Sequence, residues 1–141
     1  MMRTRMMAAA VMVLGCGAAQ ARSSIWDGVY SDAQATRGQT AYMQNCSRCH
    51  GVTLMGTFEI PPLVGRIIPY YAGSSLDVFL DYISTAMPLS RPGSLSPATN
   101  ADIVAYILKS NGLPSGANDL TAAGAKAISF DTAKPGKRAK K

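Results

Sequence analysis

The sequence predicts an all-α fold with three main helices and long loops. Three stretches carry apolar residues at helical spacing beside capping signals. No stretch alternates apolar and polar residues, as a strand would, for more than a few positions. A chain of 141 residues is long enough for one domain and short for two, so we expect a single core.

The first helix is expected to begin at about Asp32. Ser31, with Gln34 three residues later, forms the start of a capping box. One helical face then carries Gly38, Tyr42, Cys46 and Cys49. The two cysteines are therefore expected in the last turn of this helix.

The second helix is expected after a loop rich in proline and glycine, "EIPPLVGRIIPYYAGSS", whose composition excludes long regular structure. Ser74 or Ser75 would cap this helix, and Pro88 follows its end. Its apolar positions repeat at i, i+3, i+4 and i+7: Leu76, Phe79, Leu80 and Ile83. The loop before it is long enough to wrap a bound group.

The third helix is expected to start at Ser96-Pro97, an N-cap followed by proline at the first helical position. It runs to about Asn111, where an Asn-Gly pair ends it. Its apolar stripe contains Ile103, Tyr106 and Ile107. Beyond it, Ile128 and Phe130 are expected to anchor the following segment to the core.

The N-terminus has the pattern of a secretory signal. Arg3 and Arg5 precede an apolar run, and Ala19-Gln20-Ala21 is the small-x-small pattern of a cleavage site. An alternative interpretation of "VLGC" is a lipoprotein signal that lipidates Cys16. Both interpretations place the mature protein outside the cytoplasm, and we expect it in the periplasm.

The net charge of +6 is concentrated at the two ends of the chain. Residues 22–133 contain seven basic and eight acidic residues, whereas the last eight residues carry five basic ones. The folded part is therefore nearly neutral, which gives no reason to expect a nucleic-acid surface. These features predict four segments: a signal peptide at 1–21, the main domain at 22–116, a C-terminal extension at 117–133 and a basic tail, expected to be disordered, at 134–141.

The pentapeptide Cys46-Ser47-Arg48-Cys49-His50 is the main chemical motif. A closed zinc site needs four ligands, and the mature chain has two cysteines and one histidine. A thioredoxin-like redox pair belongs on a strand-to-helix turn of a βαβ fold, which this sequence does not show. A simple disulfide between the cysteines would leave His50 without a role. A catalytic Cys-His pair is disfavoured because residues adjacent in sequence seldom approach each other correctly. Covalent attachment of haem uses all three residues, with two thioether bonds and the imidazole on the iron.

The second axial ligand is expected to be Met87. Once the signal is removed, no second histidine remains, and the methionines left are Met43, Met55 and Met87. Met43 lies on the attachment helix, and Met55 follows His50 too closely to reach the opposite face of the ring. Met87 lies thirty-seven residues beyond His50, which leaves enough chain to pass round a haem.

With these motifs, the chain resembles the class I, single-haem c-type cytochromes over about residues 30 to 114. The matching pieces are "RGQTAYMQNCSRCHG", "IPPLVG", "TAMP" and "ADIVAYILKSNG". The resemblance implies a class I cytochrome c fold wrapped round one covalently bound haem c, in which the first and last helices cross with Gly38 and Tyr42 against Ile103 and Tyr106. It also implies that the Pro61 carbonyl accepts the imidazole hydrogen bond and that Leu63 covers the ring, although Pro62 leaves the register open.

The expected function is electron transfer, without enzymatic activity, by a monomeric carrier. The segments "WDGVYSDAQATRG" and "SRPGSLSP" resemble cytochromes associated with quinoprotein (PQQ) dehydrogenases, which implies such a donor and an oxidase or another cytochrome as acceptor. The basic tail offers peripheral contact with an anionic membrane or an acidic partner. Two alternatives remain open: an open-site haem enzyme or sensor of peroxide or gas, and a fixed haem subunit of a dehydrogenase complex.

Overall fold

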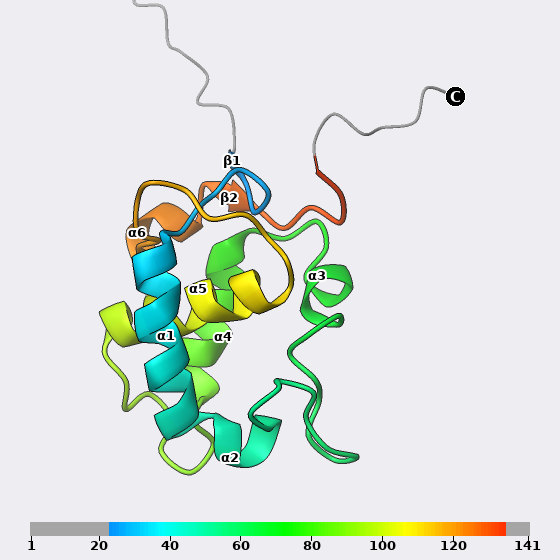
Figure 1. The fold of residues 1–141 in the computed structure, drawn as a ribbon, viewed down its shortest axis with the longest axis vertical. Helices are drawn as coiled ribbons and strands as arrows, with labels where there is room; N and C mark the ends of the chain where they lie inside the picture. Colours follow the sequence, from blue (N-terminus) through cyan, green and yellow to red (C-terminus); the bar gives the residue numbers. More distant parts are fainter. Residues whose placement is uncertain (1–22, 135–141) are drawn as a thin grey trace, which may run out of the picture.

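The structure, a computed structural model, describes residues 23–134. These residues form six helices and two short strands: β1 (Ser23–Ser24), α1 (Asp32–Asn45), α2 (Ser47–His50), α3 (Ile67–Tyr70), α4 (Leu76–Ala86), α5 (Pro97–Ser110), α6 (Ala122–Ala125) and β2 (Ile128–Ser129). The three longest helices are the three that the sequence predicts (Figure 1). Among residues 23–134, no helix combines the length and apolar character needed to cross a bilayer. The predicted signal peptide, Cys16 and the basic residues after Lys134 lie outside the described residues.

Helices α1 and α5 cross at a glycine. A Cβ atom on Gly38 would lie 1.8 Å from the carbonyl oxygen of Asp102, so only glycine allows this approach. One turn further along α1, the ring centroids of Tyr42 and Tyr106 lie 5.3 Å apart. The predicted crossing is therefore confirmed for Gly38, Tyr42 and Tyr106, and Ile103 is buried on the same helix.

The N-terminus of α1 is capped differently from the prediction. The Ser31 hydroxyl accepts the Gln34 amide hydrogen at 3.0 Å, as a capping box requires. The Gln34 side chain, however, does not turn back to Ser31: it bonds the Leu120 amide at 2.6 Å and the Leu120 carbonyl at 2.8 Å. The reciprocal half of the predicted box is therefore wrong, because a buried backbone segment from the C-terminal part competes for the same amide.

Helix α5 begins as predicted, with the Ser96 hydroxyl accepting the Thr99 amide hydrogen at 3.1 Å and Pro97 in the first turn. Helix α4 follows Ser75, whose side chain makes no capping bond and instead contacts Asp77. The apolar face predicted for α4 is buried along its whole length.

The C-terminal extension is part of the core. Phe130 is fully buried, and its backbone exchanges hydrogen bonds with Gly73 and Ser74 at 3.0 and 2.9 Å. β2 pairs in parallel with β1, joining the start of the described chain to this segment. No strand was expected, because two-residue strands are too short to show an alternating pattern in the sequence.

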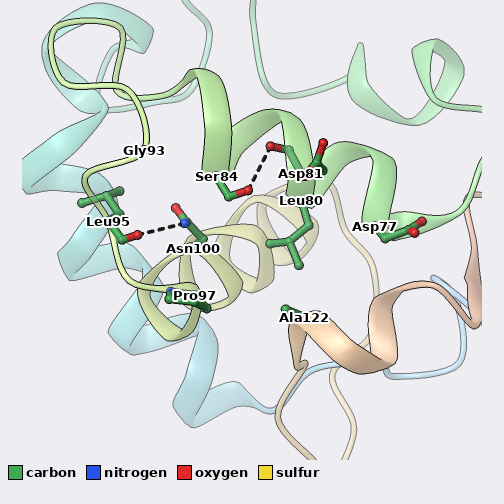
Figure 2. Close-up of a pocket in the computed structure, with 9 residues that line it drawn as sticks. All are labelled: Asp77, Leu80, Asp81, Ser84, Gly93, Leu95, Pro97, Asn100 and Ala122. Atoms are coloured by element: carbon green, nitrogen blue, oxygen red, sulfur yellow. Dashed lines mark hydrogen bonds between the residues drawn. The ribbon is translucent and has the colours of Figure 1, made fainter.

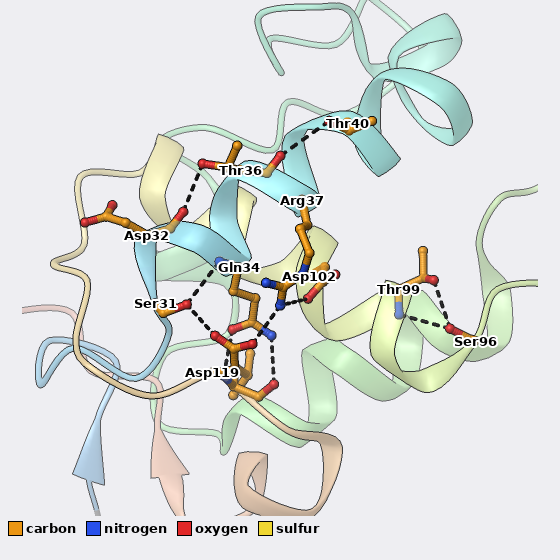
Figure 3. A network of polar contacts seen from close by, with 11 residues as sticks. Ser31, Asp32, Gln34, Thr36, Arg37, Thr40, Ser96, Thr99, Asp102 and Asp119 are labelled. Atoms are coloured by element: carbon orange, nitrogen blue, oxygen red, sulfur yellow. Dashed lines mark hydrogen bonds and ion pairs between the residues drawn. The ribbon is translucent and has the colours of Figure 1, made fainter.

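A polar network fastens this extension to the helix pair (Figure 3). The Arg37 guanidinium bonds Asp102 at 3.1 Å and Asp119 at 2.7 Å, and Asp119 also accepts the Ser31 hydroxyl. These bonds, first that of Ser31 and then that of Arg37, lower the pKa of the Asp119 carboxyl. One arginine thus links α1, α5 and the segment before α6.

Candidate functional site

The predicted attachment motif lies where α1 gives way to α2. α1 ends at Asn45, and Cys46 is its C-cap with φ −123° and ψ −34°. The prediction that both cysteines lie in the last turn of the first helix is therefore wrong: Cys49 and His50 belong to α2. The break changes the direction of the chain, yet the His50 amide still bonds the Cys46 carbonyl at 3.0 Å, which keeps the three side chains within one turn.

Both cysteines are free thiols. Cys46 is half-buried beside the core, whereas Cys49 is exposed. Burial, and secondarily the neighbouring Cys49, raises the pKa of the Cys46 thiol to about 11, so this thiol is protonated at neutral pH. Within residues 23–134 no group of three or more His, Cys, Asp or Glu side chains is arranged to hold a metal ion by itself.

The His50 ring is oriented by the loop that follows it. Its Nδ1 lies 3.1 Å from the carbonyl oxygen of Pro61, which fits Nδ1–H as the donor. Its Nε2 has no hydrogen-bond partner in the described part of the chain. A donor on Nδ1 fixes the tautomer that leaves the Nε2 lone pair available to a metal. The contact involves Pro61 and not Pro62, which is the register that the resemblance implied.

Leu63 is placed by two backbone bonds. Its amide bonds the Leu54 carbonyl at 2.8 Å, and its carbonyl accepts Asn111 Nδ2 at 2.8 Å. Asn111 also accepts the Gly65 amide hydrogen at 2.9 Å. The sequence indicated Asn111 only as the end of a helix; its role in fixing the loop was missed, since no local pattern links positions so far apart in the chain.

Met87 ends α4, and its backbone amide bonds the Ile83 carbonyl at 3.2 Å. Four residues later, Arg91 Nη2 lies 3.1 Å from Asn45 Oδ1, directly before Cys46. This contact brings the segment after Met87 to the attachment motif, and Figure 1 shows α2 and the end of α4 at the same end of the molecule. Met87 is half-buried, whereas Met55 is 60% exposed. Ligation by Met87 stays a prediction.

The residues around the motif fit a haem. The loop after His50 exposes Val52, Met55 and Phe58. An imidazole with a free Nε2, two free thiols and uncovered apolar side chains together form the donor set and contact surface that a covalently held macrocycle requires.

A groove of about 460 Å³ lies on another side of α4 (Figure 2). Its walls include Asp77, Asp81 and Ser84 of α4, together with Leu95 and Asn100. It contains none of the predicted ligands. The Asn100 Oδ1 atom lacks a partner within residues 23–134, while its Nδ2 makes a long bond of 3.4 Å to the Leu95 carbonyl.

A sequence model of a protein family and a solved structure match parts of this chain. Residues 33–107 match the sequence model of the family described as cytochrome c oxidase, cbb3-type, subunit III. No curated protein sequence is similar enough to the chain to count as a match. Among solved structures, the chain is similar to the sulfane dehydrogenase SoxCD from Paracoccus pantotrophus, with a TM-score of 0.54 and 23% identity. That match covers 80% of this chain and 66% of the other, slightly less than two thirds, and at this identity it concerns the fold alone.

Proposed function

This chain belongs to the mono-haem cytochrome c family, and on that premise we propose that it is a periplasmic one-electron carrier with one haem c bound through Cys46 and Cys49. Haem, when bound, supplies a one-electron couple between ferric and ferrous iron. The single observation that carries the proposal is the hydrogen bond between His50 Nδ1 and the Pro61 carbonyl, which prepares Nε2 as a ligand.

The protein residues have separate roles in this proposal. Cys46 and Cys49 would hold the cofactor, and His50 and Met87 would bind its iron. The Pro61 carbonyl orients the imidazole and makes it a stronger donor. Leu63 excludes water from the His50 side, and its position is fixed by Asn111. With both His50 and Met87 bound to the iron, no position would be left for a substrate, which favours a carrier over an enzyme.

The partners are redox proteins. The loop after His50 leaves Met55 and Phe58 exposed, and Leu89 after Met87 is 77% exposed. A small apolar surface of this kind suits brief encounters with low affinity. We assign a quinoprotein dehydrogenase as the electron donor, because the segments "WDGVYSDAQATRG" and "SRPGSLSP" resemble cytochromes associated with such enzymes. The acceptor would be a terminal oxidase or another cytochrome.

The test is the absorption spectrum of the purified periplasmic protein, oxidised and reduced, together with its intact mass. We expect the mass of one added haem, a c-type spectrum and the weak long-wavelength band of methionine-ligated ferric iron. Cys46→Ala and Cys49→Ala are the controls, and each should lose one thioether bond. Haem without the methionine band would favour the open-site enzyme or sensor, and a protein without covalent haem would refute the proposal.

The donor assignment is tested separately. Reduction of the ferric protein by a quinoprotein dehydrogenase is followed by stopped flow, and a sizing column is run with and without that enzyme. A carrier is reduced rapidly and elutes alone. Permanent co-elution would instead favour a fixed haem subunit.

A further inference from the structure

We infer that the Tyr42 hydroxyl is a positioning group for His50: it fixes the turn directly after the ligand and thereby the orientation of the imidazole. The inference rests on the proposed function, because it takes His50 to be an axial ligand. Sequence patterns present Tyr42 only as a packing residue of the α1–α5 crossing.

The Tyr42 hydroxyl donates a hydrogen bond of 2.7 Å to the carbonyl oxygen of Gly51. Gly51 is the residue after His50, so this bond holds the Gly51–Val52 peptide, one residue beyond the ligand. The tyrosine side chain is fully buried, and burial, followed by the proximity of Cys46 and Tyr106, raises its pKa to about 12. The hydroxyl therefore remains a neutral donor at any physiological pH.

The turn that Tyr42 holds is constrained at both ends. The Gly51 carbonyl also accepts the Leu54 amide hydrogen at 3.3 Å, and the Gly56 amide bonds the His50 carbonyl at 2.8 Å. Gly51 has φ 76°, and Leu54 has φ 61°, a region that residues with a side chain rarely adopt. Such a backbone persists only where surrounding contacts impose it. Leu54 is buried, and the Tyr42 hydroxyl is the side-chain donor on this turn.

The His50 ring is thus held on two sides. The Pro61 carbonyl fixes its Nδ1 edge. The Gly56 amide holds the carbonyl of the His50–Gly51 peptide, and the Tyr42 hydroxyl holds the carbonyl of the next peptide, Gly51–Val52. The bond to Pro61 alone would leave the imidazole free to rotate about the line from Nδ1 to the Pro61 oxygen. The backbone bonds made by Tyr42 and Gly56 limit this rotation, because they fix the main chain from which the ring extends.

The chain offers a matched control. Tyr106 lies against Tyr42, with ring centroids 5.3 Å apart, and its hydroxyl has no hydrogen-bond partner among residues 23–134. Tyr42→Phe and Tyr106→Phe therefore each remove one hydroxyl from the same aromatic pair. Only the first removes the bond to Gly51.

Two readouts on the haem-loaded protein test the inference. The ferric EPR spectrum and the paramagnetically shifted haem methyl resonances respond to the orientation of the axial ligands. Amide hydrogen exchange of Gly56, measured in the reduced diamagnetic protein, reports opening of the turn. We expect Tyr42→Phe to change both spectra and to speed exchange at Gly56 about tenfold, equivalent to ~1.4 kcal/mol. Tyr106→Phe should leave the spectra and the Gly56 rate unchanged.

Spectra of Tyr42→Phe that coincide with the parent spectra would overturn the inference, as would equal changes in Tyr106→Phe. Faster exchange without a spectral change would assign Tyr42 to the stability of the turn alone and would also refute a positioning role. A parent protein without covalent haem would instead refute the proposed function, and that result is visible in its mass before either variant is made.

Discussion

His50 illustrates how single atoms decide what a motif can do. Its Nδ1 is held by the Pro61 carbonyl, and the carbonyl of the next residue, Gly51, is held by the Tyr42 hydroxyl. A histidine on a surface helix would be free to rotate, and its tautomers would interchange. Here the backbone carbonyl selects one tautomer, so the chain presents a prepared ligand at Nε2.

Replacement of Met87 by alanine tests the second axial ligand. We expect Met87→Ala to lose the long-wavelength ferric band and to lower the reduction potential, because the thioether favours ferrous iron. Absorption spectra and redox titration measure both effects. Met55→Ala is the control, since Met55 is exposed in the loop after His50. Loss of the band in Met55→Ala, and not in Met87→Ala, would transfer the ligand role to Met55.

At the scale of elements, the α1–α5 pair depends on the distance at which two backbones can approach. Gly38→Ala would place a Cβ 1.8 Å from the Asp102 carbonyl oxygen, and backbone atoms there cannot yield as a side chain would. We expect a loss of about 2 kcal/mol or more in the free energy of unfolding, measured by urea denaturation. Gln39→Ala, at an exposed position of the same helix, should change it by less than about 0.5 kcal/mol. A Gly38→Ala protein of parental stability would contradict the close crossing.

The attachment of the C-terminal extension to α1 depends on Gln34. Gln34→Ala removes both bonds to Leu120 and leaves a buried amide and carbonyl without partners. We expect about 2–6 kcal/mol of destabilisation, since each of the two unpaired buried groups costs ~1–3 kcal/mol. Faster proteolysis within residues 117–131 should accompany it. Thr36→Ala, on the exposed side of α1, is the control, and equal proteolysis of both variants would contradict this role.

At the scale of the whole molecule, stability should depend on pH through the surface carboxylates that join distant segments. Lys109, then Ser115, lowers the pKa of Asp32, while Ser31 and Arg37 lower that of Asp119. A carboxyl whose pKa falls on folding stabilises the folded protein at pH values above the pKa of that carboxyl in the unfolded chain, here 3.8. That stabilisation is lost as the pH falls through the lower folded value.

We therefore expect the urea midpoint to fall below about pH 3.8 and Asp119→Asn to flatten that part of the profile. Both carboxyls are exposed, so 1 M salt should weaken the effect. Glu59→Gln, in the exposed loop, is the charge-matched control. A profile of Asp119→Asn that parallels the parent profile at low pH would contradict the contribution of this network.

Much of the fold and part of the site could be predicted from local sequence patterns. The limits of α5 follow from its cap at Ser96 and Pro97, and those of α4 from its apolar spacing and the proline after it, which are properties of neighbouring positions. The α1 prediction was right at its start and wrong at its end, because the break at Cys46 has no proline or glycine to indicate it. The pairing of β1 with β2 was missed, since it joins residues more than one hundred positions apart.

The sequence by itself determined the chemistry of the attachment motif, because the two thiols and the imidazole are contiguous and need no fold to bring them together. The helix crossing at Gly38 and Tyr42 was expected only through the resemblance to c-type cytochromes, and the structure confirms it. Only the tertiary structure decided that Pro61 faces His50, that Gln34 binds Leu120 and that Tyr42 holds Gly51. In each of these contacts a backbone carbonyl or amide is one partner. Nearly every residue carries the same backbone groups, so the sequence does not indicate which of them meet when a loop closes over a helix.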